Sequence, residues 1–253
     1  MREIRLIDDA GGIAAGKALD IRQAGPIGKS DTIVTGSADV LVAASADVII
    51  VADPVNDGEW EGERGLALVE RLIRAGCTAP LVFAGPKQTW LMEAAARELH
   101  VPADRLIGTA AAAVVNTVAA LVHAELGQSG AQVAAVGRPP SFVIGWNAAT
   151  IAGSLITDRV AAHRLLAISQ SLTRLWPPGP QAIAAPTALV VEALSSGSRA
   201  LLPAAAITEG ELGARGVAAL LCVEFGRGRI LRRAIPTLSP QERTEATNTL
   251  LKR

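Results

Sequence analysis

Short apolar runs and segments of helical periodicity alternate along the first hundred residues. Runs of strand length bounded by polar or turn-forming residues predict strands at Ile4–Ile7, Thr32–Thr35, Asp47–Ala52, Pro80–Ala84 and Arg105–Gly108. The run at 47–52 is apolar almost throughout, which is typical of a strand covered on both faces. Strands that alternate with helices indicate an α/β fold with a doubly wound parallel sheet.

Helical patterns fill the intervals between these runs. Apolar residues three or four positions apart and plausible caps predict helices at about 14–24, at 38–44 with Ser37 as N-cap, at 63–76 with Gly76 as C-cap, and at 87–100. The polar, turn-rich segment 53–62 separates the third strand from the next helix.

The second half of the chain has a different order of elements. The pattern predicts helices at 109–126, 158–176 and 182–195, strands at 131–136 and 142–146, a hairpin over 217–225 and 229–235, and a last helix. Ser239 and Glu242 form a capping box at the start of that last helix, with Pro240 in its first position. This half is therefore expected to be a mixed α/β region.

Composition excludes some classes of partner. Half of the 253 residues are apolar, the net charge is zero, and the apolar run 109–126 is broken by polar residues. We therefore expect neither nucleic-acid binding nor a membrane span. Cys77 and Cys222 lie far apart, and the chain opens on a charged strand rather than a signal peptide, which favours a soluble, cytoplasmic protein.

The opening stretch suggests nucleotide chemistry. The strand ending at Ile7 is followed by Asp8, then by Gly11 and Gly12, and then by a helix. A strand that ends in a carboxylate and turns through glycine into a helix is typical of the second half of a dinucleotide-binding βαβ unit, where the acid binds the adenosine ribose. The first half of that unit, with its G-x-G-x-x-G turn, would precede Met1.

Several stretches resemble the lactate/malate dehydrogenase family. They include GKALD followed by PI and VTG near the start, SADVIIVAD, VPADRLIGTA and ATIAGSLI farther along, and EGELG followed by a Gly-rich hairpin and a helix that begins LSPQE. The resemblance extends from Ile4 to about Ala246. It implies a Rossmann-like NAD-binding domain at 1–107, lacking its first strand and Gly-rich loop, and a catalytic-type mixed α/β domain at 108–253.

The resemblance implies NAD as the cofactor. It places the ribose-binding acid on Asp8, although Asp8 is equally well interpreted as an acid that caps the turn into Gly11. The resemblance implies an Asn-Pro pair whose asparagine would hold the nicotinamide carboxamide. Here the pair is Gly85-Pro86, so glycine replaces that asparagine. Without a phosphate loop in the chain, we expect weak or absent NAD binding.

The residues that perform catalysis in the family are missing from the matching positions. Pro139 stands where the catalytic histidine would be, and the partner aspartate and the substrate-binding arginine are absent near Val114 and Thr117. The loop 53–62 contains no arginine. The resemblance implies two arginines on this loop, one that polarises the substrate carbonyl and one that supports substrate recognition. Arg64 is a candidate for the second, but an arginine at a helix start is more often a solvated surface charge.

No other catalytic arrangement replaces them in the sequence. The three histidines, His100, His123 and His163, have no acid beside them in a motif, and no metal-ligand spacing is visible. Because the loss of one triad-type residue costs about 10³- to 10⁴-fold in rate, we expect no efficient dehydrogenase activity.

Three hypotheses remain open. The chain is a catalytically silent relative with a structural or regulatory role, pairing with itself or with a relative; or it is an NAD-dependent oxidoreductase whose sequence starts inside its first domain; or it is a nucleotide or metabolite sensor. Because the missing strand would lie centrally in the sheet, we also expect the strand beside it to be covered by the chain or by a partner.

Overall fold

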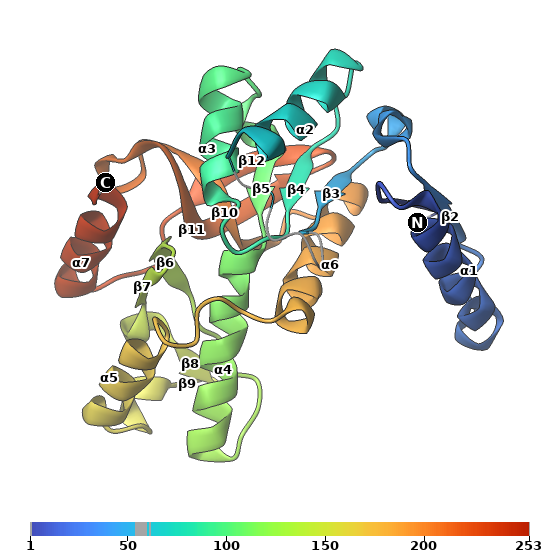
Figure 1. The fold of residues 1–253 in the computed structure, drawn as a ribbon. Coiled ribbons are helices and arrows are strands. Elements are labelled where there is room, and N and C mark those ends of the chain that lie inside the picture. Colours follow the sequence, from blue (N-terminus) through green and yellow to red (C-terminus); the bar gives the residue numbers. More distant parts are fainter. Residues whose placement is uncertain (1, 54–59, 61, 253) are drawn as a thin grey trace. The chain divides into compact units, whose positions relative to one another are not determined.

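The computed structural model describes residues 2–53, 60 and 62–252. Contacts divide the chain into two compact units, residues 1–49 with 67–79 and residues 50–66 with 80–253. Figure 1 shows the elements of both. These units do not coincide with the domains 1–107 and 108–253 expected from the sequence, and that boundary stays a prediction.

The first unit contains a βαβ motif. Strands β1 (Glu3–Ile7) and β2 (Ile33–Ser37) pair in parallel and are connected by helix α1 (Gly11–Gly28). Gly36 in β2 allows the helix to approach closely, because a Cβ there would overlap the backbone of Ala14 and Ala15. The sequence prediction of this motif is confirmed, although α1 is longer at both ends than expected.

Of the two helix caps predicted in this unit, one is confirmed and one is wrong. Gly76 ends helix α2 (Gly62–Arg74) with a positive φ of 82°, as predicted. The segment after β2 is instead a 3₁₀ helix, η1 (Val40–Ser45). Its N-cap is Asp39, whose carboxylate accepts the N–H of Leu41, so the prediction of Ser37 as the cap is wrong.

The second unit is built on a mixed sheet. The strand order is β3-β4-β5-β10-β11-β6-β7, and β12 also pairs with β11. The strands are β3 (Ile49–Val51), β4 (Leu81–Phe83), β5 (Leu106–Gly108), β6 (Ala135–Arg138), β7 (Ser141–Ile144), β10 (Leu201–Glu209), β11 (Arg215–Gly226) and β12 (Arg229–Ala234). Strands β4 and β5 are parallel, whereas β10 pairs antiparallel with both β5 and β11.

Helices and short turns complete the second unit. They are α3 (Thr89–Glu98), η2 (Ala103–Arg105), η3 (Ala110–Ala112), α4 (Ala113–Leu126), η4 (Trp146–Ala148), η5 (Ile156–Asp158), α5 (Ala162–Ser171), α6 (Pro180–Ser196), η6 (Glu211–Gly213) and α7 (Pro240–Leu251), with a small hairpin of β8 (Thr150–Ile151) and β9 (Ser154–Leu155). The capping box of α7 is present as predicted, with Ser239 and Glu242 each accepting a backbone N–H of the other. No helix in the described ranges is both long and apolar enough to cross a membrane.

Several predicted boundaries are wrong. The helix expected at 158–176 is replaced by the short turn η5 and by α5, which spans only Ala162–Ser171. The strand expected at 131–136 begins at Ala135. Strand β10 was not predicted, because LLPAAAITE does not alternate and has β-branched residues only near its end. It is held by its neighbours on both sides.

The terminal strand of the larger sheet differs from the prediction for the run 47–52. Strand β3 is shorter than that run, and the side chain of Ile50 is 49% exposed. Among the described residues β3 is the last strand of its sheet. The expectation that the strand beside the missing one is covered, by another part of the chain or by a partner, stays a prediction.

Candidate functional site

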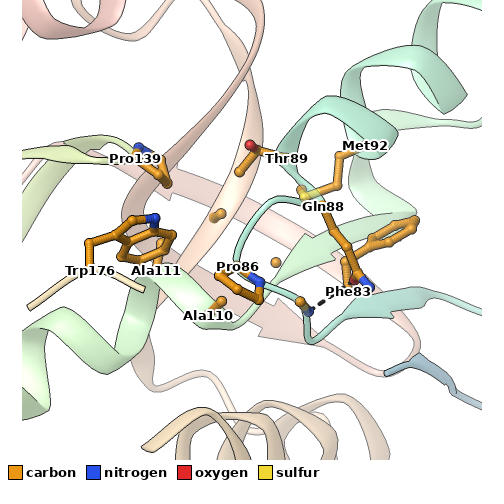
Figure 2. A pocket seen from close by; sticks show the side chains of 12 residues that line it. Phe83, Pro86, Gln88, Thr89, Met92, Ala110, Ala111, Pro139 and Trp176 are labelled. Carbon is orange, nitrogen blue, oxygen red and sulfur yellow. Dashed lines mark hydrogen bonds between the residues drawn. The ribbon is translucent and has the colours of Figure 1, made fainter. Parts of the chain in front are cut away.

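The cavity at the carboxyl ends of β4 and β5 is the candidate site, because open α/β sheets bind ligands at this edge. Figure 2 shows its lining, which is formed by Phe83, Gly85, Pro86, Gln88, Thr89, Met92, Gly108, Ala110, Ala111, Pro139, Trp176 and Ala205. Its composition is largely apolar. Among the described residues, no charged group lines the cavity that a carboxylate substrate could contact.

The cavity is almost filled by its own side chains. Its volume is about 10 Å³, at the lower limit of roughly 10–15 Å³ that one water molecule requires. Pro139 and Trp176 lie on one side, and the Trp176 indole also packs against Phe142, with 5.4 Å between ring centroids. A 2-oxo acid therefore has no room in this arrangement.

A hydrogen-bonded group occupies the space beside Gly85. The fully buried Gln88 accepts the N–H of Gly85 with Oε1 at 3.0 Å and donates from Nε2 to Asp53 Oδ1. The same oxygen of Asp53 accepts the N–H of Trp60 at 3.0 Å. A Cβ on Gly85 would overlap both Asp53 and Gln88. The position expected to carry the carboxamide-binding asparagine is thus closed to any side chain.

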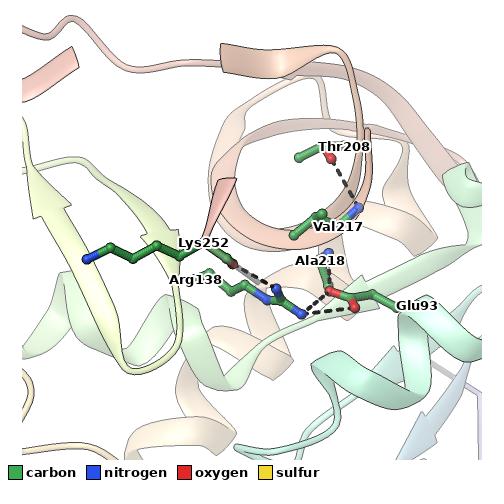
Figure 3. Close-up of polar contacts among 6 residues, drawn as sticks. All are labelled: Glu93, Arg138, Thr208, Val217, Ala218 and Lys252. Carbon is green, nitrogen blue, oxygen red and sulfur yellow. Dashed lines mark hydrogen bonds and ion pairs between the residues drawn. The ribbon is translucent and has the colours of Figure 1, made fainter. Parts of the chain in front are cut away.

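An ion pair fixes the hairpin that carries Pro139. Arg138 donates from Nη2 to both carboxylate oxygens of Glu93 at 3.0 Å, and its Nη1 lies 3.5 Å from the carbonyl oxygen of Lys252 (Figure 3). Glu93 also accepts the N–H of Ala218 at 2.9 Å, and its side chain is only 12% exposed. A partly buried ion pair of this kind makes charge-assisted hydrogen bonds, which are stronger than hydrogen bonds between neutral groups.

Sequence reasoning missed both Trp176 and the Glu93–Arg138 pair. The two partners are 45 positions apart in the chain, on α3 and β6. No local pattern links residues at that separation.

Asp8 belongs to the smaller unit. Its carboxylate is exposed, and Oδ1 accepts the N–H of Ala10 at 2.8 Å. This is the capping contact that the sequence allowed as an alternative to ribose binding. The second oxygen leaves Asp8 able to accept a further hydrogen bond.

Arg64 does not line the cavity. Its side chain is exposed, and its guanidinium carbon lies 4.7 Å from the centroid of the Trp60 ring. Such a cation–π contact is typical of a surface arginine. Residues 54–59 and 61 of the loop expected between strand and helix lie outside the described residues.

The remaining candidate groups lie away from the cavity. His100, His123 and His163 are all exposed and none lines it, while Val114 is buried and Thr117 donates its hydroxyl to Ala113. Within residues 2–53, 60 and 62–252, no group of three or more metal-ligating side chains converges.

The two cysteines are free thiols. Cys77 is buried and Cys222 is half-buried. Burial raises the pKa of the Cys222 thiol, which lowers the fraction present as thiolate at neutral pH. Cys222 is therefore a poor nucleophile.

Comparison with known proteins identifies the fold. No family model and no curated protein sequence matches the chain. Among solved structures, malate dehydrogenase from Salinibacter ruber aligns over 98% of this chain and 86% of its own, at 22% identity and a TM-score of 0.87.

Two further structures give the same result. Lactate dehydrogenase from Cryptosporidium parvum, in complex with lactic acid and nicotinamide adenine dinucleotide, covers 98% of this chain and 86% of its own at 18% identity and a TM-score of 0.87. Malate dehydrogenase from Aeropyrum pernix covers 98% and 87% at 17% identity and a TM-score of 0.85. The chain therefore has the fold of the malate and lactate dehydrogenases, at a sequence identity that fits a diverged member.

Proposed function

We propose that this protein is a catalytically silent relative of the malate and lactate dehydrogenases, with a structural or regulatory role. One observation carries the proposal: Pro139 and Trp176 line a cavity of about 10 Å³ at the carboxyl ends of β4 and β5. A proline has no proton to exchange, and a filled cavity leaves no place for substrate. The fold is retained while the chemistry is lost.

A cofactor and turnover assay tests this proposal. NADH fluorescence is measured with the full chain, with and without oxaloacetate or pyruvate, beside an active malate dehydrogenase under the same conditions. We expect weak or absent NADH binding and no oxidation. Substrate-dependent oxidation at about 1–10³ s⁻¹, the usual range for enzymes, contradicts the proposal and supports the oxidoreductase alternative.

Asp8 gives this assay a residue-level control. If any NADH binding is detected, Asp8→Asn weakens it, because an amide loses the charged acceptor for the ribose hydroxyls. The neighbouring exposed acid Asp9 provides the matched control, and Asp9→Asn leaves binding unchanged. Equal effects of both substitutions indicate a general charge effect and remove Asp8 from the cofactor site.

Two alternatives have separate tests. The neighbouring structures are longer, with 86–88% of each covered by this chain. An in-frame G-x-G-x-x-G upstream in the gene supports an NAD-dependent oxidoreductase with a complete first domain. NADH binding without turnover supports a nucleotide or metabolite sensor.

We infer that the protein is an oligomer and resides in the cytoplasm. Helix α1 exposes Ile13, Leu19 and Ile27, at 65%, 53% and 89%, and such apolar exposure is typical of a contact surface. Leu19→Glu is expected to lower the sedimenting mass of a homo-oligomer, whereas Lys17→Glu, a charge change on the same helix, is not. The two free, separate cysteines favour a reducing compartment.

A further inference from the structure

Arg233 on β12 is a buried cation with incomplete hydrogen bonding. Its side chain is 7% exposed, and Nη1 donates to Glu209 Oε2 at 2.9 Å. Its Nε and Nη2 are buried and have no hydrogen-bond partner among the described residues. Because buried polar groups are nearly always paired, two orphaned donors on one charged group require an explanation.

The two free donors have a specific geometry. Nε–H and one Nη2–H of a guanidinium lie along the same edge and point in parallel. This edge matches the two oxygens of a carboxylate or phosphate. The contact with Glu209 uses Nη1 and leaves the matching edge unoccupied.

The nearby turn between β10 and β11 supplies a second cation. Arg215 lies opposite Glu209 in the strand register, and its guanidinium nitrogens are 4.0 Å from the Cβ position of Gly210. Arg215 makes no ion pair within the described part of the chain.

The acids of the same turn do not reach the free edge. Glu211 Oε2 accepts the backbone N–H groups of Glu209 and Gly210, at 2.6 and 3.2 Å. Glu209 is 60% exposed and pairs with the other side of the guanidinium. The charges of the two arginines, Arg215 and Arg233, and of the two glutamates add to zero. Even so, no acceptor among the described residues faces the buried edge of Arg233.

We propose that the free edge of Arg233 binds a small oxyanion, either a carboxylate or a phosphate, beside the turn between β10 and β11. The ligand is small because neither donor nitrogen is exposed at the surface, so access requires the turn to shift. Arg215 is placed to attract the anion from solvent. This site is independent of the filled cavity and of the proposed silent function.

A buried water is the competing explanation, since a water can satisfy the same two donors. The two explanations differ in their dependence on solute. A ligand that binds only the folded state raises the unfolding temperature as its concentration rises. A water-filled site gives no such dependence on a particular anion.

The experiment titrates the full chain with sodium phosphate and, separately, sodium acetate, with chloride replacing them at constant ionic strength. We expect the unfolding temperature to rise with at least one oxyanion and not with chloride. A rise with phosphate alone identifies a phosphate-type ligand, and a rise with acetate alone a carboxylate. No rise with either overturns the proposal.

Matched variants assign the effect to Arg233. Arg233→Lys keeps the charge but lacks the parallel donors, so it is expected to weaken binding by about tenfold or more. Arg232→Lys is the control, because Arg232 is 60% exposed and already pairs with Glu224. An equal response in Arg233→Lys and wild type overturns the assignment.

A second readout does not depend on any Arg233 variant folding. Glu209→Gln removes a negative charge beside the site, which would repel an anion, and is expected to tighten anion binding about fivefold, the scale of one exposed charge interaction. The Nε–H resonance of Arg233 should shift on addition of the effective anion. An unchanged resonance together with unchanged affinity in Glu209→Gln contradicts the site.

Discussion

The two compact units bury their strands to very different degrees. In the smaller unit, β1 has no fully buried residue and β2 has only Val34. In the larger unit, every residue of β4 and β5 is buried. The unit that contains the βαβ motif thus has the smaller core, and the unit that contains the filled cavity has the deeper one.

The units also differ in what their apolar side chains pack around. In the larger unit, Pro139 and Trp176 help to line the nearly filled cavity at the carboxyl ends of β4 and β5. In the smaller unit, the βαβ motif is present, but its strands bury little apolar surface. Hydrophobic burial is the main stabilising term, so the units should differ in local stability.

Hydrogen exchange should give the largest contrast. Amides of β4, β5, β10 and β11 are expected to exchange only through global unfolding, at about 5–15 kcal/mol. Amides of β1 and β2 should exchange at far lower opening free energies, because few buried contacts oppose their opening. Mass-spectrometric exchange of peptides from the two regions measures this, and equal protection contradicts the comparison.

Core truncation should give the next largest difference. Leu106 in β5 is fully buried, so Leu106→Ala is expected to lower the free energy of unfolding by about 2–5 kcal/mol. Ile33 in β2 is 59% exposed, and Ile33→Ala should cost less than about 1 kcal/mol. Chemical denaturation measures both, and similar losses would mean that β2 is buried in solution.

Glycine substitutions probe the smaller unit directly. Gly36→Ala places a Cβ against the backbone of α1 and is expected to destabilise this unit by about 1–3 kcal/mol. Gly12→Ala is the matched control, since no atom lies within 4 Å of its added Cβ. Because alanine favours helix, Gly12→Ala should be neutral or stabilising by about 0.5–1 kcal/mol. Hydrogen exchange of the α1 amides measures both effects: it should become faster in Gly36→Ala and should not become faster in Gly12→Ala.

The sequence predicted local features better than distant contacts. The βαβ motif of the first 35 residues, the C-cap Gly76 and the capping box at Ser239 depend on residues close together in the chain, and all are found. The final hairpin is also correct. Such features are determined by short-range backbone geometry, so one sequence is enough to predict them.

Features that depend on packing could not be predicted. Strand β10 exists because β5 and β11 flank it, and its small residues give no strand pattern. The absence of a catalytic histidine at Pro139 was predicted from the resemblance. That Trp176 fills the space beside it was not, because Trp176 approaches from a segment 37 positions away in sequence.

The ion pair beside Pro139 should have a moderate effect. Glu93→Gln and Arg138→Met are each expected to destabilise the fold, and a double-mutant cycle should give a coupling free energy of about 1–2 kcal/mol, because the pair is charge-assisted and mostly buried. The exposed pair Arg97–Glu98 is the control, with an expected coupling of at most about 0.5 kcal/mol. Equal coupling free energies in the two pairs would show that burial does not strengthen the Glu93–Arg138 interaction.

The pH dependence of stability should give the smallest difference between the units. Hydrogen bonds from Arg199 and Arg232 lower the pKa of Glu224 in the larger unit, and a hydrogen bond from Arg5 lowers the pKa of Glu3 in the smaller one. In both cases the folded state holds the carboxylate more strongly than the unfolded state does. The resulting stability is present above the ordinary pKa of 4.5 and is lost as pH falls through the lowered value.

The two carboxylates should differ in how much they contribute to the pH dependence of stability at high salt, because they differ in burial. The Glu224 side chain is 9% exposed, whereas that of Glu3 is 44% exposed, so solvent and salt screen the interactions of Glu3 more strongly. Glu224→Gln should therefore flatten the decline of the unfolding temperature below pH 4.5 at high salt, while Glu3→Gln should leave it unchanged. A flattening by Glu3→Gln alone would mean that β1 is more protected from solvent than the larger sheet is at Glu224, and would reverse the comparison of the two units.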